Sequence, residues 1–531
     1  MTKTPWGDSE QLRERRLRSG RGTPPAEVER NQRERLFGAI VAASADEGYA
    51  RTKVADLIEL SGVSSRTFYD LFGDRANLAR AALVAIVERL QGPLSASAEP
   101  LEGELSRERF ERFAAAVAEQ PATASFVLAE AFGAGPEAVA VVERGIARFE
   151  EEVLERYEVT AALAGVQAQV ITARLGGILE LTRARLRSHR EAELVGLGPE
   201  VVDVALADCA PPEPLRLGVR PRRGAQERLE VSDHAERAMR AFAITVAERG
   251  YGETRVEDVV KRAGMSARTF YAAFSGKEDL MRSAIESACA QVVAVAMPAM
   301  TRQAEWPLGV RAGFGALFNF LASRPALATL LTVGVYEAGD QAVEARLRGL
   351  APLASLIGGR APGWARLKGI ERTLLGGGLL WLAYTQVRRQ GPESLPSLAP
   401  VCTYLVLSPL LGPQAACAAA NNQGGGHAPS SGDLNLDLRV EDEQSGTIGL
   451  PLSRRKTLAA DVRRAARRSL RVDEEGWREL REVHEKALAA SLAIASRAEG
   501  RLEETGESGR DARSINVLFE MPPPDGEPEA D

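Results

Sequence analysis

Residues 61–78 read SGVSSRTFYDLFGDRANL, and residues 263–280 read AGMSARTFYAAFSGKEDL. The second stretch repeats the first without a gap, so that Gly264 stands on Gly62 and every later position keeps the same offset. In each copy a glycine that tolerates positive φ and a serine that can cap a helix separate two short helical patterns. The second pattern carries two phenylalanines one turn apart. Each stretch therefore predicts a helix-turn-helix.

A longer amphipathic helix is expected before each motif, because apolar residues recur there with helical spacing. We expect this helix to end at Gly48 in the first copy and at Gly250 in the second, and the next helix to begin with Thr52 or Thr254 as its N-cap. Weaker matches downstream extend the repeat to about 200 residues, far longer than the period of a solenoid. The chain is thus a duplicated pair of domains.

The composition is that of a soluble helical protein. Hydrophobic residues make up 45% of the chain and charged residues 26%, with few aromatics, which predicts an all-α fold. The 531 residues are too many for a single core. A net charge of −6 leaves open whether one local surface is basic enough to bind DNA.

Nothing in the sequence indicates export. The four scattered cysteines suit a reducing compartment, and the N-terminal residues lack an apolar leader. We also see no apolar run near the length that crosses a bilayer. The expectation is a cytoplasmic protein that does not cross a membrane.

The repeat and its interruptions predict eight segments. They are a basic flexible arm (1–27), a first helix-turn-helix domain (28–92), a first helical effector and dimerisation domain (93–210), a linker (211–228), a second helix-turn-helix domain (229–296), a second helical effector and dimerisation domain (297–420), a flexible linker (421–449) and a C-terminal helical tail (450–531). We call residues 28–210 the first unit and residues 229–420 the second.

Residues 52–78 and 254–280 resemble the signature of the tetracycline-repressor-like (TetR/AcrR) family, in which Ala-Gly-Val-Ser-x-x-Thr-Phe-Tyr precedes a phenylalanine, a lysine and a leucine. The second copy is nearly a consensus instance. The first has Arg75 where the family has lysine, and Asp70, whose carboxylate would face phosphates unfavourably. The resemblance implies an all-α fold of two tandem TetR-like units, each with a DNA-binding head and a helical effector domain.

The same resemblance implies DNA-binding roles for ten residues. The phosphate-contacting residues would be Thr67, Tyr69, Thr269 and Tyr271, the phosphate-anchoring cations Arg75 and Lys277, and the base-reading positions Ser65, Arg66, Ala267 and Arg268. An arginine in the major groove can donate two hydrogen bonds to guanine.

We therefore predict a ligand-responsive repressor that binds double-stranded operator DNA and an unidentified small-molecule effector. Its two units would pair within one chain as a pseudo-dimer, or two chains would form a homodimer. No cofactor, metal site or catalytic residue is expected, because no histidine has a neighbour at ligand or triad spacing. The alternatives are a protein-interaction scaffold or a ligand-binding protein whose heads have lost DNA binding.

Three features leave their interpretation open. Leu175-Gly176-Gly177 and Leu375-Gly376-Gly377-Gly378 would serve either a close helix interface or a tight core turn. The aromatics of the second unit would line an effector pocket or form plain core; they are Trp306, Phe314, Phe318, Phe320, Tyr336, Trp364, Trp381 and Tyr384. The basic helix of the tail would add phosphate contacts or form a solvated face; its arginines are Arg463, Arg464, Arg467, Arg468 and Arg471.

Overall fold

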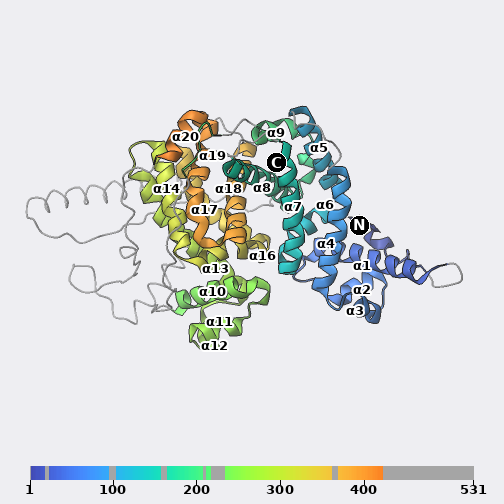
Figure 1. Cartoon of the computed structure of the whole chain (residues 1–531). Coiled ribbons are helices and arrows are strands. Elements are labelled where there is room, and N and C mark those ends of the chain that lie inside the picture. Colours follow the sequence, from blue (N-terminus) through green and yellow to red (C-terminus); the bar gives the residue numbers. More distant parts are fainter. Residues whose placement is uncertain are drawn as a thin grey trace, which may run out of the picture. The chain divides into compact units, whose positions relative to one another are not determined.

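The protein is helical over nearly all of the part that a computed structural model describes (Figure 1). The described residues are 2–17, 23–94, 103–156, 164–206, 211–216, 234–360 and 369–422. The chain divides into two compact parts, residues 1–430 and 431–531, and all the described residues belong to the first part. This part contains both the first and the second unit. The all-α prediction is confirmed. The expected C-terminal tail, with its basic helix, lies outside the described residues.

Head 1, the first predicted helix-turn-helix domain, consists of four helices. They are α1 (Pro25–Glu47), α2 (Val54–Ser61), α3 (Ser65–Phe72) and α4 (Arg75–Leu94). Gly62 adopts the left-handed conformation, with a φ of 62°, that the turn between α2 and α3 requires. The Ser64 hydroxyl then caps α3 by accepting a hydrogen bond from the backbone N–H of Thr67 at 3.2 Å.

Head 2 repeats this arrangement. It consists of α10 (His234–Glu253), α11 (Val256–Ala263), α12 (Ala267–Ala273) and α13 (Lys277–Thr301). Helix α10 breaks at Gly250, which has a φ of 82°, and Gly264 in the turn has a φ of 60°. The glycines expected at the ends of the first helices and in the turns are therefore where the backbone needs them.

The expectation that Thr52 and Thr254 cap the second helices is wrong. The N-caps are Lys53 and Arg255. The threonine hydroxyls point the other way and donate to the Gly48 carbonyl at 3.0 Å in head 1 and to its counterpart, Gly250, at 2.7 Å in head 2. Both threonines are buried, and their hydrogen bonds close the turn after the first helix.

The remaining helices form the body that follows each head. In the first unit they are α5 (Gly103–Glu119), α6 (Pro121–Leu128), η2 (Glu130–Ala134), α7 (Pro136–Arg156), α8 (Ala164–Arg187), η3 (Glu191–Leu194) and α9 (Gly198–Leu206). In the second they are α14 (Trp306–Ala322), α15 (Pro325–Thr329), η4 (Leu330–Gly334), α16 (Val335–Glu337), α17 (Asp340–Arg360), α18 (Gly369–Gln390), η6 (Pro392–Leu398), α19 (Ala399–Leu411) and α20 (Pro413–Asn421).

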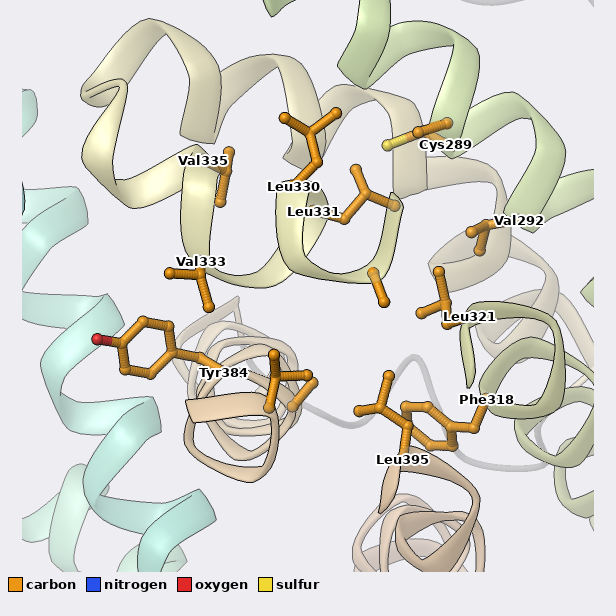
Figure 2. Packing of buried hydrophobic residues seen from close by; sticks show 14 of the residues in the cluster. Cys289, Val292, Phe318, Leu321, Leu330, Leu331, Val333, Val335, Tyr384 and Leu395 are labelled. Carbon is orange, nitrogen blue, oxygen red and sulfur yellow. The ribbon is translucent and has the colours of Figure 1, made fainter. Parts of the chain in front are cut away.

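The largest hydrophobic core in the described part of the chain lies mainly in the second unit, includes head 2, and takes in residues of the first unit such as Phe132 and Val170. Figure 2 shows part of it, with Phe318, Leu330 and Leu395 among the buried residues of the cluster. Burial favours the packing role for the described aromatics of the second unit. Those buried in this core are Trp306, Phe318, Phe320, Tyr336, Trp381 and Tyr384, and Phe314 packs against it. Trp364 lies outside the described residues.

Two helices in the described part of the chain are long and apolar enough to cross a membrane, judged by length and composition alone. They are Lys277–Thr301 and Pro392–Leu411; the bent pair Trp306–Ala322 and Pro325–Glu337 would make a third if it formed one span. This finding differs from the expectation that no run approaches that length. Both helices contribute buried residues to the core of the second unit, so their apolar surface is used in helix packing.

The N-terminal segment also differs from the expected flexible arm. Lys3–Thr4 (β1) pairs antiparallel with Gly7–Asp8 (β2), and a short helical turn, η1 (Ser9–Gln11), follows. Trp6 and Leu12 are buried in the core of head 1. We call residues 2–17 the N-terminal strap, because they fold onto head 1.

Candidate nucleic-acid interface

The second helix of each helix-turn-helix presents a polar face because its apolar face is anchored in the head. In head 1, Phe68 and Phe72 are buried, with ring centroids 6.4 Å apart. Their burial turns the Arg66 side chain, 93% exposed, and Tyr69, 53% exposed, towards solvent. Helix α3 can therefore offer a guanidinium and a phenol to a groove.

Head 2 shows the same construction. Phe270 and Phe274 are buried, with ring centroids 5.6 Å apart. Arg268 is exposed, and so is Tyr271, at 60%. Ala267 in head 2 and Ser65 in head 1 are exposed as well. The structure thus places all the predicted base-reading positions on the outer surface of α3 and α12.

The threonine that follows each base-reading arginine contacts the serine that caps the helix. The Ser64 and Thr67 hydroxyl oxygens are 2.8 Å apart, and those of Ser266 and Thr269 are 2.9 Å apart. Both threonines are only half-buried. Each hydroxyl lies at the N-terminal end of its helix, where the unpaired backbone N–H groups and the helix dipole favour a negative group such as a phosphate.

The outer faces of the two helices differ in charge. In head 1 the Arg66 Nε atom lies 3.7 Å from an oxygen of Asp70, and both side chains are exposed. Head 2 has Ala272 at the matching position, so this ion pair has no counterpart there. Asp70 both engages the base-reading arginine and brings negative charge to the face that meets phosphates, which makes α3 the less favourable of the two surfaces.

The predicted phosphate-anchoring cations contact their own heads. Arg75 donates to the carbonyls of Tyr49, at 3.0 Å, and Thr52, and its guanidinium carbon lies 4.3 Å from the centre of the Tyr49 ring. Lys277 donates to the Tyr251 carbonyl at 2.9 Å, with its nitrogen 4.2 Å from that ring. Each cation therefore ties the start of the fourth helix to the segment that follows Gly48 or Gly250.

Burial changes the acid-base properties of this contact in head 2. Desolvation lowers the pKa of Lys277, although the charges of Glu253 and Glu278 act in the opposite direction. Desolvation also raises the pKa of Tyr251 to about 12, with a smaller contribution from Glu278. The lysine thus sits partly inside the head, under the tyrosine that follows the helix break.

A pair of body carboxylates holds the same tyrosines, and the sequence did not reveal it. The backbone N–H of Tyr49 donates to Glu130 at 2.6 Å, and that of Tyr251 donates to Glu337 at 2.6 Å. Burial raises the pKa of both carboxyl groups, against the effect of these hydrogen bonds. The spacing between the two glutamates along the sequence differs from the spacing between the two heads. The gap-free repeat therefore does not align them with each other.

The comparisons with known proteins bear on head 2. Residues 239–284, which run from α10 into α13, match the family model described as bacterial regulatory proteins, tetR family. A comparison with curated proteins gave no match. The matched range covers the helix-turn-helix with Arg268 and Tyr271, so these residues lie in the part of the chain that is similar to this family.

Proposed function

We propose that this chain, in which residues 239–284 form a DNA-binding domain of the tetR family of bacterial regulatory proteins, is a ligand-responsive repressor that binds one operator with both heads. The observation that carries the proposal is the exposure of Arg66 and Arg268 at matching places on two helices of the same construction. Neither arginine is covered by another part of the described chain, so a double helix can reach both.

The close packing of α8 against α18 supports pairing of the two units within one chain (Figure 1). A Cβ atom placed on Gly176 would lie 2.3 Å from the Cβ of Trp381, and one on Gly378 would lie 2.3 Å from the Ala173 carbonyl oxygen. Only glycine permits two helix backbones to approach so closely. Of the two roles considered for the glycine-rich helices, these distances favour the interface.

Charge complementarity gives this pairing a direction. Arg388 on α18 forms two hydrogen bonds to Glu143 on α7, at 2.8 and 3.0 Å, and Arg389 forms one to Glu150 at 2.8 Å. In Figure 2 the Tyr384 hydroxyl points out of the core towards the helices of the first unit, where Glu143 accepts its hydrogen bond at 2.7 Å. In these contacts the first unit supplies the acids and the second the bases, whereas the Arg187–Asp340 pair has the reverse arrangement. A pair of identical first units would leave Glu143 and Glu150 without these basic partners.

The pKa of Glu143 reflects this contact. Burial alone would raise the pKa, but the hydrogen bonds from Arg388 and Tyr384 and the neighbouring positive charges outweigh it, and the pKa is lowered. The same contact raises the pKa of Arg388. Glu143 and Arg388 are therefore both ionised at the near-neutral pH at which the protein would bind DNA.

A buried cluster at the same interface fixes the register of the two units. Arg183, whose side chain is 2% exposed, places its guanidinium carbon 5.1 Å from the centre of the Phe132 ring, 5.1 Å from that of Tyr336 and 5.0 Å from that of Trp381. It also forms an ion pair with Glu180. Because only the first unit supplies the charged pair and the second supplies most of the rings, the cluster suits one specific partner.

The cluster adjoins the carboxylates that hold the heads, which supports a route for ligand response. Phe132 is in η2 with Glu130, and Tyr336 is in α16 beside Glu337. The rings of Phe132 and Tyr336 are 5.5 Å apart. A shift of either body against the other would therefore act on the turns of both heads and change their separation.

The hollow beside head 2 is too small to hold an effector. That hollow, of about 30 Å³, lies between α10, α13 and α15 and is lined by Met239, Gln291 and Leu327 among others. It has room for about one water molecule, whereas a drug-sized ligand occupies roughly 300 Å³ or more. A wider hollow of about 710 Å³ lies in the first body, where Arg107, Glu108 and Glu111 are among the residues that line it. An effector would use such a space, or open the packed bodies, rather than fill the hollow beside head 2.

Binding measurements on the DNA upstream of the protein's own gene test the proposal. We expect Arg66→Ala and Arg268→Ala each to cost about 1–3 kcal/mol and to relax base preference in a different half of the site. Arg348→Ala, which removes an exposed arginine from α17, is the matched control and should leave affinity unchanged. Full affinity in the Arg66→Ala/Arg268→Ala protein would favour the scaffold instead.

A further inference from the structure

The N-terminal strap is seated on head 1 by a specific fit to α1. The Trp6 and Phe37 rings are 5.1 Å apart, and the Arg89 guanidinium carbon lies 5.0 Å from the centre of the Trp6 ring. A Cβ atom placed on Gly38 would lie 2.7 Å from a methyl carbon of Leu12 and 3.1 Å from the Thr4 hydroxyl. The strap therefore lies in a shallow seat that the glycine leaves open.

The last part of the strap runs past the turn that leads into the recognition helix. A Cβ atom placed on Gly62 would lie 2.7 Å from the Cγ of Arg13, so the stem of that arginine covers the turn. The Asn31 side chain accepts a hydrogen bond from the Leu17 N–H at 3.3 Å and donates one to the Arg15 carbonyl at 3.0 Å. These contacts hold residues 13–17 against the N-terminal half of α1.

Arg16 lies on the same side of the head. It stands between Arg15 and Leu17, whose backbone groups are both bound by the Asn31 side chain. Its positive charge adds to the effect of burial in lowering the pKa of Arg35. Arg35 itself is buried and donates to the Ser61 carbonyl at 2.7 Å, at the start of the turn. Arg13 and Arg16 thus flank the turn between α2 and α3.

We propose that the strap is a second DNA-binding element of head 1, in which Arg13 and Arg16 bind backbone phosphates beside the bases that α3 reads. This inference rests on the proposed function. Gly62 is three residues from Ser65, a span of at most roughly 11 Å, so Arg13 stands next to the end of the helix that enters the groove.

The burial of the strap does not by itself explain these arginines. Trp6 and Leu12 account for its packing, whereas Arg13 and Arg16 are exposed, and no described carboxylate forms a salt bridge with either one. Two cations that no described carboxylate neutralises, placed beside a DNA groove, attract phosphates. They would offset the negative charge that Asp70 brings to the face of α3.

The salt dependence of operator binding tests the inference. Each phosphate contact contributes about 0.9 to the slope of log affinity against log salt concentration, so Arg13→Ala/Arg16→Ala should lower the slope by about 1.8. Between 50 and 200 mM salt, the loss of affinity would then be about 12-fold smaller than in the unmodified protein. Arg302→Ala/Arg348→Ala removes the same charge from exposed body positions and should keep the original slope.

A second variant separates placement of the strap from charge. Gly38→Val puts side-chain atoms where Leu12 and Thr4 lie, which displaces the strap but keeps both arginines. We expect the slope of log affinity against log salt concentration to fall by the same amount. The footprint should shorten only at the half-site of head 1. An unchanged slope in Arg13→Ala/Arg16→Ala would overturn the inference. If Arg66→Ala/Arg268→Ala also bound DNA normally, the proposed function would fail with it.

Discussion

Replacing Arg183 by methionine should destabilise the packing between the two units. Arg183 forms an ion pair with Glu180 and donates to the Leu128 carbonyl at 2.6 Å, and all of these groups are buried. Removing one member of a buried ion pair costs about 3–5 kcal/mol, because the other is left charged. The charge of Arg346 also acts on Glu180, so part of the compensation remains and we expect about 3 kcal/mol.

The companion variant makes this reasoning refutable. Glu180→Gln/Arg183→Met/Arg346→Met removes all three buried charges of the cluster, because Arg346 is buried as well and its charge also acts on Glu180. Replacement of a whole buried pair or triad by uncharged residues of similar size is often neutral or stabilising. Urea unfolding at neutral pH, followed by tryptophan fluorescence because Trp381 lies in the cluster, measures both proteins. The reasoning is refuted if Arg183→Met costs less than about 1 kcal/mol, or if the triple variant is as unstable as the single one.

Other predictions concern the carboxylates. Burial raises the pKa of Glu130, so the folded chain keeps a proton that the unfolded chain releases, and stability falls as pH rises from the ordinary glutamate pKa to the raised one. Thermal unfolding of Glu130→Gln should show a shallower decline over that range, and an identical pH profile would contradict this. Asp70→Ala should tighten DNA binding severalfold in an anisotropy titration, Ala272→Asp should weaken it, and equal affinities would count against a role for this face. Arg388→Glu should weaken the contact with Glu143, and adding Glu143→Arg should restore it, with a coupling of about 1 kcal/mol after solvent screening; zero coupling in the double-mutant cycle would refute the pair's role.

The sequence predicted the parts of the site that depend on local spacing. The buried phenylalanines Phe68 and Phe270 follow from helical periodicity, and the positive φ of Gly62 and Gly264 follows from the chemistry of a tight turn. These features need no knowledge of distant residues. They sufficed to identify both heads and the exposed arginines.

Features that depend on distant contacts escaped the sequence. Arg183 looks like any charged residue of an amphipathic helix, and only the approach of Trp381 and Tyr336 makes it a buried cation. The basic composition of the N-terminal segment predicted flexibility, yet the glycine at position 38 creates a seat for Leu12. The position of Arg75 in the sequence likewise cannot reveal that two carbonyls of the same head accept hydrogen bonds from its guanidinium. Its role as a phosphate anchor stays a prediction.

The number of chains in the operator complex tests the central claim most directly. Native mass spectrometry of the purified protein with a selected operator duplex would give the mass of that complex. If the two heads of one polypeptide bind successive major grooves, about 34–36 Å apart, the complex contains one chain per duplex and the selected half-sites differ in sequence. Two chains on a strictly palindromic duplex would contradict the account.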